Sequence, residues 1–404
     1  MVSSPKLVIT QLFLPTHLTA SNALRSALPY LYRRSHWSQA IQQNQLGPKP
    51  FPLIFAALVT ALRPRANGLA PTVDPTRISI NPNGGGTYPR LAQLADGSVL
   101  GAVTAFSGST HILTVTRSTD GARTFAAWGT VATGTGDLDN MHLKQLPNGD
   151  VLATFRNHDK NAAGAYTFYR ITACISHDNG KTWAFLSQVD QRTPTTANNG
   201  LWEPFIRVSK SGAIQVYYAA ENSASDQDIL MRSSTNNGAT WSAATTVAGG
   251  GTTGRDGMPG CTDLTASGGS ARVLCIFETT EGTAPLFTVK SVVSSNDGAS
   301  FSGRTQVYAP AGHNAGAPQI VTTSAGILVA SFMTDEEHSG SSAWPQGASM
   351  KILTSDSSLA WGQKTTVLPI SSLWPGLYSR LDGSATVVGC ADNGGATCRS
   401  ISFA

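Results

Sequence analysis

The sequence predicts an all-β protein folded as one β-propeller of six blades. Two interleaved repeats and a turn-rich composition support this prediction. Of 404 residues, 40 are glycine and 21 are proline, while only 13% are charged. Such a composition indicates a globular chain rich in turns and strands. Repeats of about 58 residues are typical of folds in which each copy forms one structural unit.

The first repeat is an eight-residue turn of the form Ser-x-Asp-x-Gly-x-Thr-Trp, complete at residues 176–183. Weaker copies begin at Ser118, Ser234, Ser294 and Thr354, so the five starts are 58, 58, 60 and 60 residues apart. In such a turn the carboxylate or amide accepts backbone N–H groups, and the glycine adopts a conformation that other residues resist. The motif resembles the Asp-box of sialidases. That motif is a structural device, so we assign it no catalytic role.

The second repeat is a hairpin turn containing glycine, followed by a hydrophobic strand. Its six glycines are Gly97, Gly149, Gly212, Gly268, Gly326 and Gly383. Six copies predict six blades of four short antiparallel strands. Only 21 residues follow Gly383, too few to complete the last blade. Residues 77–80 are therefore expected to supply a strand there, which would close the ring and remove its exposed edges.

The N-terminal region is expected to lie outside the propeller. Residues 51–62 form a mostly apolar run with the length and composition of a signal-peptide core, although it lies unusually far from Met1. A buried helix is the alternative. We divide the chain into an N-terminal extension at 1–49 that we expect to be disordered, a signal-peptide-like segment at 50–70 and a catalytic propeller at 72–404. This division predicts a secreted protein. No apolar run reaches the length of a membrane span.

The five cysteines allow two disulfides. Cys390 and Cys398 flank an Asn-Gly-Gly turn and could face each other across a hairpin, and the spacing of Cys261 and Cys275 permits a second bridge. Cys174 would then remain as a buried thiol, although pairing cannot be deduced from sequence. No cysteine spacing fits a zinc site and no phosphate-binding loop is present, so we expect no metal and no cofactor. The net charge of +4 includes no basic stripe, which argues against a nucleic-acid partner.

Acids and aromatic residues gather where the innermost strands begin and the second strands end. Counted from the repeats, the inner strands begin near Tyr88-Pro89-Arg90, Asp139-Asn140-Met141-His142, Trp202-Glu203-Pro204, Asp256-Gly257-Met258-Pro259, His313-Asn314 and Trp374-Pro375. The second strands end near Asn157, Glu221, Glu278, Asp335 and Asp392. Paired carboxylates flanking a glycosidic bond are what glycoside hydrolysis requires. For any single acid, a turn cap or an ion pair with arginine is an equally good explanation.

Three segments carry a specific resemblance. Residues 202–205 (WEPF), 254–261 (GRDGMPGC) and 277–282 (FETTEG) resemble active-site segments of the fungal exo-1,5-α-L-arabinanases of glycoside hydrolase family 93, within a likeness that covers residues 72–404. The resemblance implies a monomeric secreted enzyme of plant cell wall degradation. It would release arabinobiose from the non-reducing end of linear arabinan with retention of configuration. Glu203 and Glu278 would carry the reaction.

The roles of the two glutamates stay open at this point. Glu278 follows the apolar run 273–277, which would raise its pKa and favour the acid/base role, leaving Glu203 as nucleophile. The reverse assignment is the alternative. Glu221 is a rival because glycine counting puts it in the position equivalent to Glu278, one blade earlier. We predict that the substrate contacts Tyr88, Arg90, His142, Trp202, Glu221, Asp256, Trp374 and Tyr378.

Two other functions compete with this reading. An exo-α-sialidase would use a tyrosine nucleophile, and Tyr378-Ser379 resembles the segment that carries it. However, the expected Arg-Ile-Pro order is replaced by Tyr88-Pro89-Arg90, and Arg207 and Arg255 do not complete a convincing triad. A non-catalytic carbohydrate-binding propeller is the second competitor, because fold does not imply function.

Overall fold

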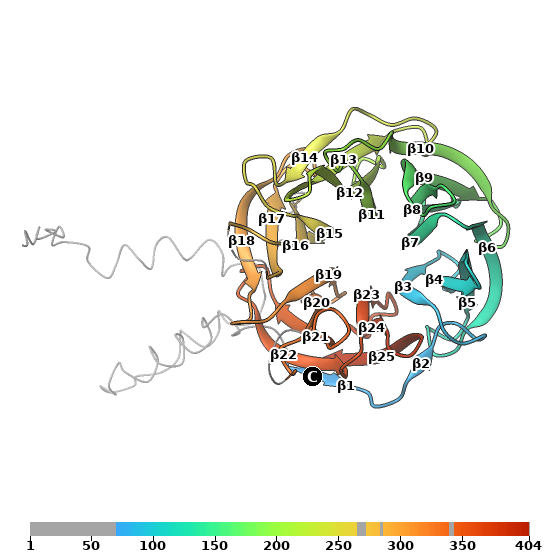
Figure 1. Ribbon diagram of the computed structural model, residues 1–404. Coiled ribbons are helices and arrows are strands. Elements are labelled where there is room, and N and C mark those ends of the chain that lie inside the picture. Colours follow the sequence, from blue (N-terminus) through green and yellow to red (C-terminus); the bar gives the residue numbers. More distant parts are fainter. Residues whose placement is uncertain (1–69, 265–271, 283–285, 339–342, 404) are drawn as a thin grey trace, which may run out of the picture. The chain divides into compact units, whose positions relative to one another are not determined.

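The structure is a computed structural model and describes residues 70–264, 272–282, 286–338 and 343–403. In this part of the chain the regular secondary structure consists of β-strands in six antiparallel sheets. The sheets are arranged as blades around a common axis (Figure 1). The predicted six-bladed β-propeller is therefore confirmed. The extension at 1–49 and all but the last residue of the segment at 50–70 lie outside the described residues.

Five blades are each built from four strands that are consecutive in sequence. Blade one contains β3 (Thr87–Gln93), β4 (Val99–Ser107), β5 (Thr110–Ser118) and β6 (Ala126–Gly134). Blade two contains β7 (Asp137–Gln145), β8 (Val151–Lys160), β9 (Tyr166–Ser176) and β10 (Ala184–Arg192). Blade three contains β11 (Leu201–Val208), β12 (Ile214–Ser223), β13 (Asp226–Ser234) and β14 (Thr245–Ala248). Blade four contains β15 (Gly257–Leu264), β16 (Arg272–Thr279), β17 (Thr288–Ser294) and β18 (Ser302–Tyr308). Blade five contains β19 (Ala315–Thr322), β20 (Leu328–Thr334), β21 (Ser349–Ser355) and β22 (Gly362–Leu368).

The last blade joins both ends of the described chain. It contains β23 (Leu373–Ser379), β24 (Val387–Asp392) and β25 (Ala396–Phe403), and its outer strand is β1 (Pro71–Val73). The short strand β2 (Ile78–Ser79) also pairs with β25, which confirms the strand expected at residues 77–80. The pairing of β1 with β25 was not anticipated from the sequence. Together the two N-terminal strands close the ring (Figure 1).

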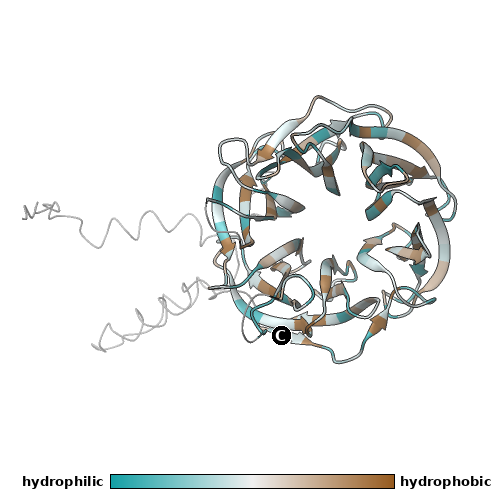
Figure 2. Ribbon diagram, in the orientation of Figure 1, coloured by the Kyte–Doolittle hydropathy of each residue, from teal (hydrophilic) through white to brown (hydrophobic). Residues whose placement is uncertain are grey.

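Hydrophobic packing lies mainly between neighbouring blades. Six clusters of buried side chains each draw on two adjacent blades, and a seventh gathers residues from blades one, four and five. Figure 2 accordingly shows hydrophobic residues on every blade rather than in one region. Each blade is therefore stabilised by the two blades that flank it, as expected for a repeat fold.

The repeated turn folds as its sequence predicts. In the complete copy, Ser176 Oγ accepts the N–H of Gly180 at 2.8 Å, and Asp178 Oδ1 accepts the N–H of Thr182 at 2.8 Å. Gly180 has a φ of 84°, a conformation that favours glycine. The Trp183 side chain packs against the cluster between blades one and two. These contacts give the turn a structural role.

Two disulfides join neighbouring strands, as the cysteine spacing permitted. Cys261 of β15 is bonded to Cys275 of β16, and Cys390 of β24 is bonded to Cys398 of β25. In each case the two residues are direct cross-strand partners. Cys174 is a buried free thiol, as expected.

Every first strand carries an irregularity at the same point. The pairing register shifts near the start of β3, β7, β11, β15, β19 and β23, as in a β-bulge. At each shift one non-glycine residue has a φ of about 50°, and these six residues are Tyr88, Asn140, Glu203, Met258, Ala317 and Trp374. Five of them precede proline, which suits a bulge because proline cannot donate to the strand ladder. We call these six positions the bulge ring.

Candidate active site

The bulge ring brings residues from all six blades toward the axis. Tyr88 of blade one stacks on Trp374 of blade six, with ring centroids 5.0 Å apart and an interplanar angle of 19°. Tyr88 also shares a buried cluster with Met258 and Ala317 of blades four and five. Non-glycine residues with positive φ are strained, and such positions concentrate at functional sites. The fold thus uses a repeated bulge to aim one side chain per blade, and in blade three that residue is Glu203.

The two predicted catalytic glutamates are held in the same way. Glu203 Oε2 accepts the backbone N–H of Met258 at 3.2 Å, and Glu278 Oε2 accepts the backbone N–H of Ala317 at 2.6 Å. In both cases the donor is the bulge residue of the next blade. Each carboxylate is therefore fixed across a blade interface rather than by its own strand.

The Glu278 carboxylate occupies space that is free because residues 257 and 316 are glycines without a Cβ atom. A Cβ atom added to Gly257 would lie 3.1 Å from Glu278 Oε1, and one added to Gly316 would lie 2.5 Å from Glu278 Oε2. The Gly316 position also faces the indole of Trp344, whose ring would lie 3.0 Å from the added Cβ. Trp344 belongs to the segment between β20 and β21, and its place beside this acid was not predicted from the sequence.

The surroundings of the two glutamates give them different protonation states. Desolvation, with the neighbouring Glu203 charge, raises the pKa of Glu278 to about 8, against the lowering effects of the Ala317 N–H and the Arg255 charge. Desolvation also raises the pKa of Glu203, but the Arg156 guanidinium opposes it and favours the carboxylate. A proton shared by this pair therefore belongs on Glu278 and the negative charge on Glu203.

Arg156 is a site residue that the sequence reading missed. Its side chain is held by Asp137, with Nη2 2.8 Å from Oδ1, and by Asp139, with Nη2 3.4 Å from Oδ2. The guanidinium carbon lies 5.3 Å from the Trp202 ring centroid and 6.0 Å from that of Tyr88. Arg156 thus lies near two predicted substrate-binding aromatic residues, and its positive charge also favours the carboxylate form of Glu203.

Two other predicted site residues are engaged in ion pairs. Glu221 Oε1 accepts Arg255 Nη2 at 2.8 Å, and Glu221 Oε2 accepts the N–H of Gly200 at 3.0 Å. Asp256 is fully buried and forms a bidentate salt bridge with Arg304, in which Nη1 lies 2.7 Å from Oδ2 and Nη2 lies 2.8 Å from Oδ1. Both carboxylates have partners within the protein, as a structural role requires. Arg255, in turn, stands close enough to lower the pKa of Glu203 and Glu278.

Three predicted substrate contacts lie on the inner strands, beyond the bulge residue of each strand. Arg90, His142 and Tyr378 line a cavity of about 240 Å³ that receives residues from the first strands of all six blades. Arg90 Nη1 donates to the carbonyls of Pro89 and Trp374 at 2.9 and 3.1 Å, and the Tyr378 hydroxyl donates to Gln93. Burial lowers the pKa of His142 to about 3, so this ring is neutral. The structure does not bring Tyr378 together with Glu203 and Glu278 around the bulge ring.

The register counted from the glycines was wrong in blades two, three and five. The strand position equivalent to Glu278, which pairs with Gly257, is Ala219 in blade three, which pairs with Trp202. Glu221 lies two residues beyond it, so it is not the equivalent of Glu278. In blade five the inner strand reaches the ring at Ala317 rather than at His313-Asn314. In blade two the equivalent position is Arg156, paired with Asp139, and not Asn157.

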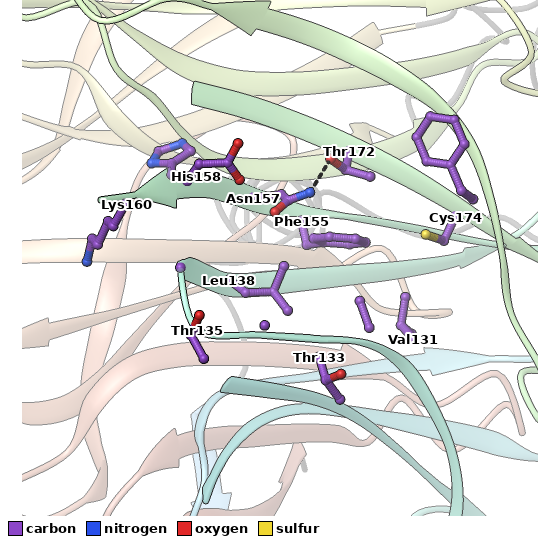
Figure 3. A pocket seen from close by; sticks show the side chains of 15 residues that line it. Val131, Thr133, Thr135, Leu138, Phe155, Asn157, His158, Lys160, Thr172 and Cys174 are labelled. Atoms are coloured by element: carbon purple, nitrogen blue, oxygen red, sulfur yellow. Dashed lines mark hydrogen bonds between the residues drawn. The ribbon is translucent and has the colours of Figure 1, made fainter. Parts of the chain in front are cut away.

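A separate cavity of about 530 Å³ lies between blades one and two (Figure 3). Figure 3 shows Asn157 in its wall, where the side-chain amide donates to Thr172 Oγ1 at 3.0 Å. Neither Glu203 nor Glu278 lines this cavity. The site around the two glutamates is therefore distinct from it.

Among the described residues no cluster of His, Cys, Asp and Glu is arranged to hold a metal ion, and no helix there is long and apolar enough to span a membrane.

No family model matches the chain, and no curated protein matches its sequence. Solved structures do match. The chain is similar to an α-L-arabinanase of Penicillium chrysogenum complexed with arabinobiose, at a TM-score of 0.63 and 19% identity over 82% of this chain and 98% of that one. It is similarly close to a GH93 α-L-arabinofuranosidase of Fusarium graminearum complexed with arabinobiose, at a TM-score of 0.63 and 18% identity over 81% of this chain and 96% of that one.

The chain shares the propeller fold of these enzymes. A sialidase of Streptococcus pneumoniae is a more distant match, at a TM-score of 0.54 and 10% identity over 79% of this chain and 68% of that one. The predicted resemblance in fold is confirmed.

Proposed function

We propose that this protein is a glycoside hydrolase that cleaves linear 1,5-α-L-arabinan. Arabinobiose would leave from the non-reducing end with retention of configuration. Glu278 would protonate the leaving oxygen, and Glu203 would attack the anomeric carbon. The resulting glycosyl-enzyme would be hydrolysed by water that Glu278 deprotonates.

One observation carries the proposal. Glu203 and Glu278 come from adjacent blades, the charge of Glu203 raises the pKa of Glu278, and each carboxylate accepts the N–H of a bulge residue. A general acid needs a raised pKa, and a nucleophile needs a stabilised negative charge. Burial supplies the first at Glu278, and the Arg156 guanidinium supplies the second at Glu203.

The aromatic residues suit a neutral sugar. Tyr88 and Trp202 lie beside Arg156, Tyr88 stacks on Trp374, and Trp344 lies beside the Gly316 position that also faces Glu278. Aromatic rings near the two acids would pack on the C–H surfaces of furanose rings. Arg156 and Arg255 are already paired with carboxylates of the protein, at 2.8 Å in each case. Arg207 is likewise paired, with Asp263 and Asp297. These pairings argue against an arginine clamp for a substrate carboxylate.

Incubation with linear arabinan, followed by identification of the first product, tests the proposal. We expect arabinobiose to appear before longer oligosaccharides, and its initial anomer, followed by NMR, to match that of the substrate. Sialyl-lactose serves as the competing substrate. Release of sialic acid at a comparable rate would support the sialidase alternative, and the absence of any cleavage together with binding would support the non-catalytic propeller.

We also propose that the enzyme is secreted and acts as a monomer outside the cell. The two disulfides support secretion, because such bonds persist in oxidising compartments. Secreted material would then begin between about residues 62 and 72, after the apolar run at 51–62. N-terminal sequencing of the protein from culture medium tests this. Met1 retained on protein confined to the cytosol would contradict it.

A further inference from the structure

A cavity of about 370 Å³ lies where the first and last blades meet. Asp74, Thr76 and Ile78 come to it from the N-terminal closing segment, and Arg123 comes from the repeated turn of blade one. Blade six adds Arg380, Thr386, Ser400 and Ser402. Arg380 directly follows the last residue of β23, whereas the bulge ring lies at the start of that strand. The cavity is therefore at the opposite end of the blades from Glu203 and Glu278.

Arg380 is buried here without the partners that its charge requires. The residue is 7% exposed, and its Nη2 donates to Ser400 Oγ at 3.2 Å. Its Nε is buried and has no hydrogen-bond partner within the described part of the chain. A guanidinium offers five N–H donors, and a buried donor left unpaired is destabilising. The Arg380 guanidinium therefore has N–H groups in the cavity wall that are available to a ligand.

A second cation faces the same space. Arg123 is exposed and donates Nη1 to the backbone carbonyl of Asp120. Its charge acts on Arg380 and, after burial, is the main effect lowering the pKa of that group, against the raising effects of Asp382, Tyr378 and Asp120. Neither arginine forms an ion pair with a carboxylate among the pairs of the described residues. Two like charges and four hydroxyl-bearing residues around one cavity favour an anionic ligand with several oxygen acceptors.

The Asp74 carboxylate in the cavity wall favours an anion that carries a proton. Asp74 lines the cavity, and its Oδ1 accepts the N–H of Thr76 at 2.8 Å. The Thr76 N–H and hydroxyl lower the pKa of Asp74, so its carboxylate is charged at neutral pH. A carboxylate accepts hydrogen bonds and repels an oxyanion that has no proton to donate. Hydrogenphosphate carries such a proton, whereas sulfate and a phosphate ester dianion do not.

We propose that this cavity is a binding site for the hydrogenphosphate ion. Arg380 and Arg123 would donate to its charged oxygens, the Ser400 and Ser402 hydroxyls would donate to the others, and Asp74 would accept its proton in a hydrogen bond. The walls come from the N-terminal closing segment, the last blade and the first blade. Bound phosphate therefore stabilises the closed ring, because a ligand that binds only the folded state raises its stability.

Thermal unfolding and calorimetric titration of the full chain test the site. The probes are sodium phosphate, sodium sulfate and glucose 6-phosphate at pH 7, each at the same ionic strength set with sodium chloride. We expect phosphate to raise the Tm in a saturable way and to bind more tightly than either of the other two. Equal effects of phosphate and sulfate would overturn the proposal, since general salt exclusion also stabilises proteins.

Three variants identify the residues involved. Arg380→Gln and Arg123→Gln should each weaken phosphate binding about tenfold or more. Arg123 is exposed, so its variant keeps the test valid if Arg380→Gln fails to fold. Arg272→Gln removes one positive charge at the start of β16 in blade four, outside the cavity, and should leave binding unchanged. Unaltered phosphate binding in Arg123→Gln would contradict the assignment, as would an equal loss in Arg272→Gln.

Discussion

Two glutamates with similar local support acquire different chemistry from their surroundings. Both accept the N–H of a bulge residue, so this contact alone does not distinguish them. Glu203 has the Arg156 guanidinium as a neighbour, whereas Glu278 is mainly desolvated and lies near the Glu203 charge. This is how one site can hold an acid and a nucleophile at the same pH.

Alanine variants should reveal the two roles separately. Glu278→Ala should lower activity on arabinan about 10²–10⁴-fold, and azide should restore much of it on an aryl arabinoside whose good leaving group needs no proton. Glu203→Ala should be rescued by azide with the opposite product configuration, because azide then attacks in place of the carboxylate. NMR of the azide adducts measures both outcomes.

Glu337→Gln is a matched control for these variants, since Glu337 pairs with Lys351 and is partly exposed on blade five. It should keep near-normal activity. Near-normal activity in Glu203→Ala or Glu278→Ala would exclude that residue from catalysis, and Glu221 would become the next candidate despite its ion pair with Arg255.

The raised pKa of Glu278 also predicts a pH-dependent stability. The group titrates near its ordinary value of 4.5 when unfolded and near 8 when folded. Between these values the folded state holds a proton that the unfolded state has lost, so stability falls as pH rises through this window. Glu278→Gln should therefore be more stable than the parent protein at pH 8, on the order of 4 kcal/mol, and nearly equal to it at pH 4. Urea unfolding at both pH values measures this, and an identical difference at the two would contradict it.

At the scale of the strand, the bulge rather than the acid is the repeated unit of the site. Each first strand presents one positive-φ residue at the ring, and the residue type there differs from blade to blade. The bulge of one blade also supplies the N–H that holds the acid of the preceding blade. The site therefore depends on the register of several strands at once.

The blades and their number were predictable from the sequence, but the register was not. Five of the six glycines lie between the first and second strands of their blades, and Gly268 lies outside the described residues. The number of residues from the glycine to the equivalent point of the second strand varies, however. Seven residues separate Gly212 from Ala219, whereas ten separate Gly268 from Glu278. When the turn is longer, every later residue shifts along the strand. Counting from the glycine therefore made Glu221 the wrong equivalent of Glu278 in the preceding blade. The proline after the bulge would have been the better marker, since it tracks the ring in five blades, including Ala317-Pro318.

Gly316 gives a prediction at this scale. A methyl group there would lie 2.5 Å from Glu278 Oε2 and 3.0 Å from the Trp344 ring, so the carboxylate must move. Gly316→Ala should lower kcat on arabinan about 10²-fold, because a displacement of about 1 Å at a catalytic group has an effect of that size. Gly251→Ala, where an added Cβ meets nothing within 4 Å, is the control and should keep full activity. Full activity in Gly316→Ala would show that Glu278 has more freedom than the structure indicates.

At the scale of the molecule, the ring is closed by residues far apart in sequence. β1 and β2 pair with β25, so the sixth blade forms only when the N-terminal strands meet the C-terminal one. The disulfide between Cys390 and Cys398 ties β24 to β25 within this blade. A sheet left open here would expose unpaired strand edges, which favour aggregation.

Ile80 offers the sharpest test of that closure. It is fully buried in the cluster between blades six and one, beside Val99, Tyr378 and Cys398, and its carbonyl accepts Thr116 Oγ1 at 2.7 Å. Ile80→Ala should lower the free energy of unfolding by about 2–5 kcal/mol, because it opens a cavity at the junction. Ile370→Ala is the control: Ile370 is 43% exposed in the segment that connects blades five and six, and its loss should change little. Deletion of residues 72–82 should go further and abolish soluble expression or lower the Tm sharply, since it removes the strand partners of β25 as well as this side chain. If both Ile80→Ala and the deletion melted like the parent protein, the last blade would not depend on the N-terminal strands, and the ring would have to be held by its other five interfaces alone.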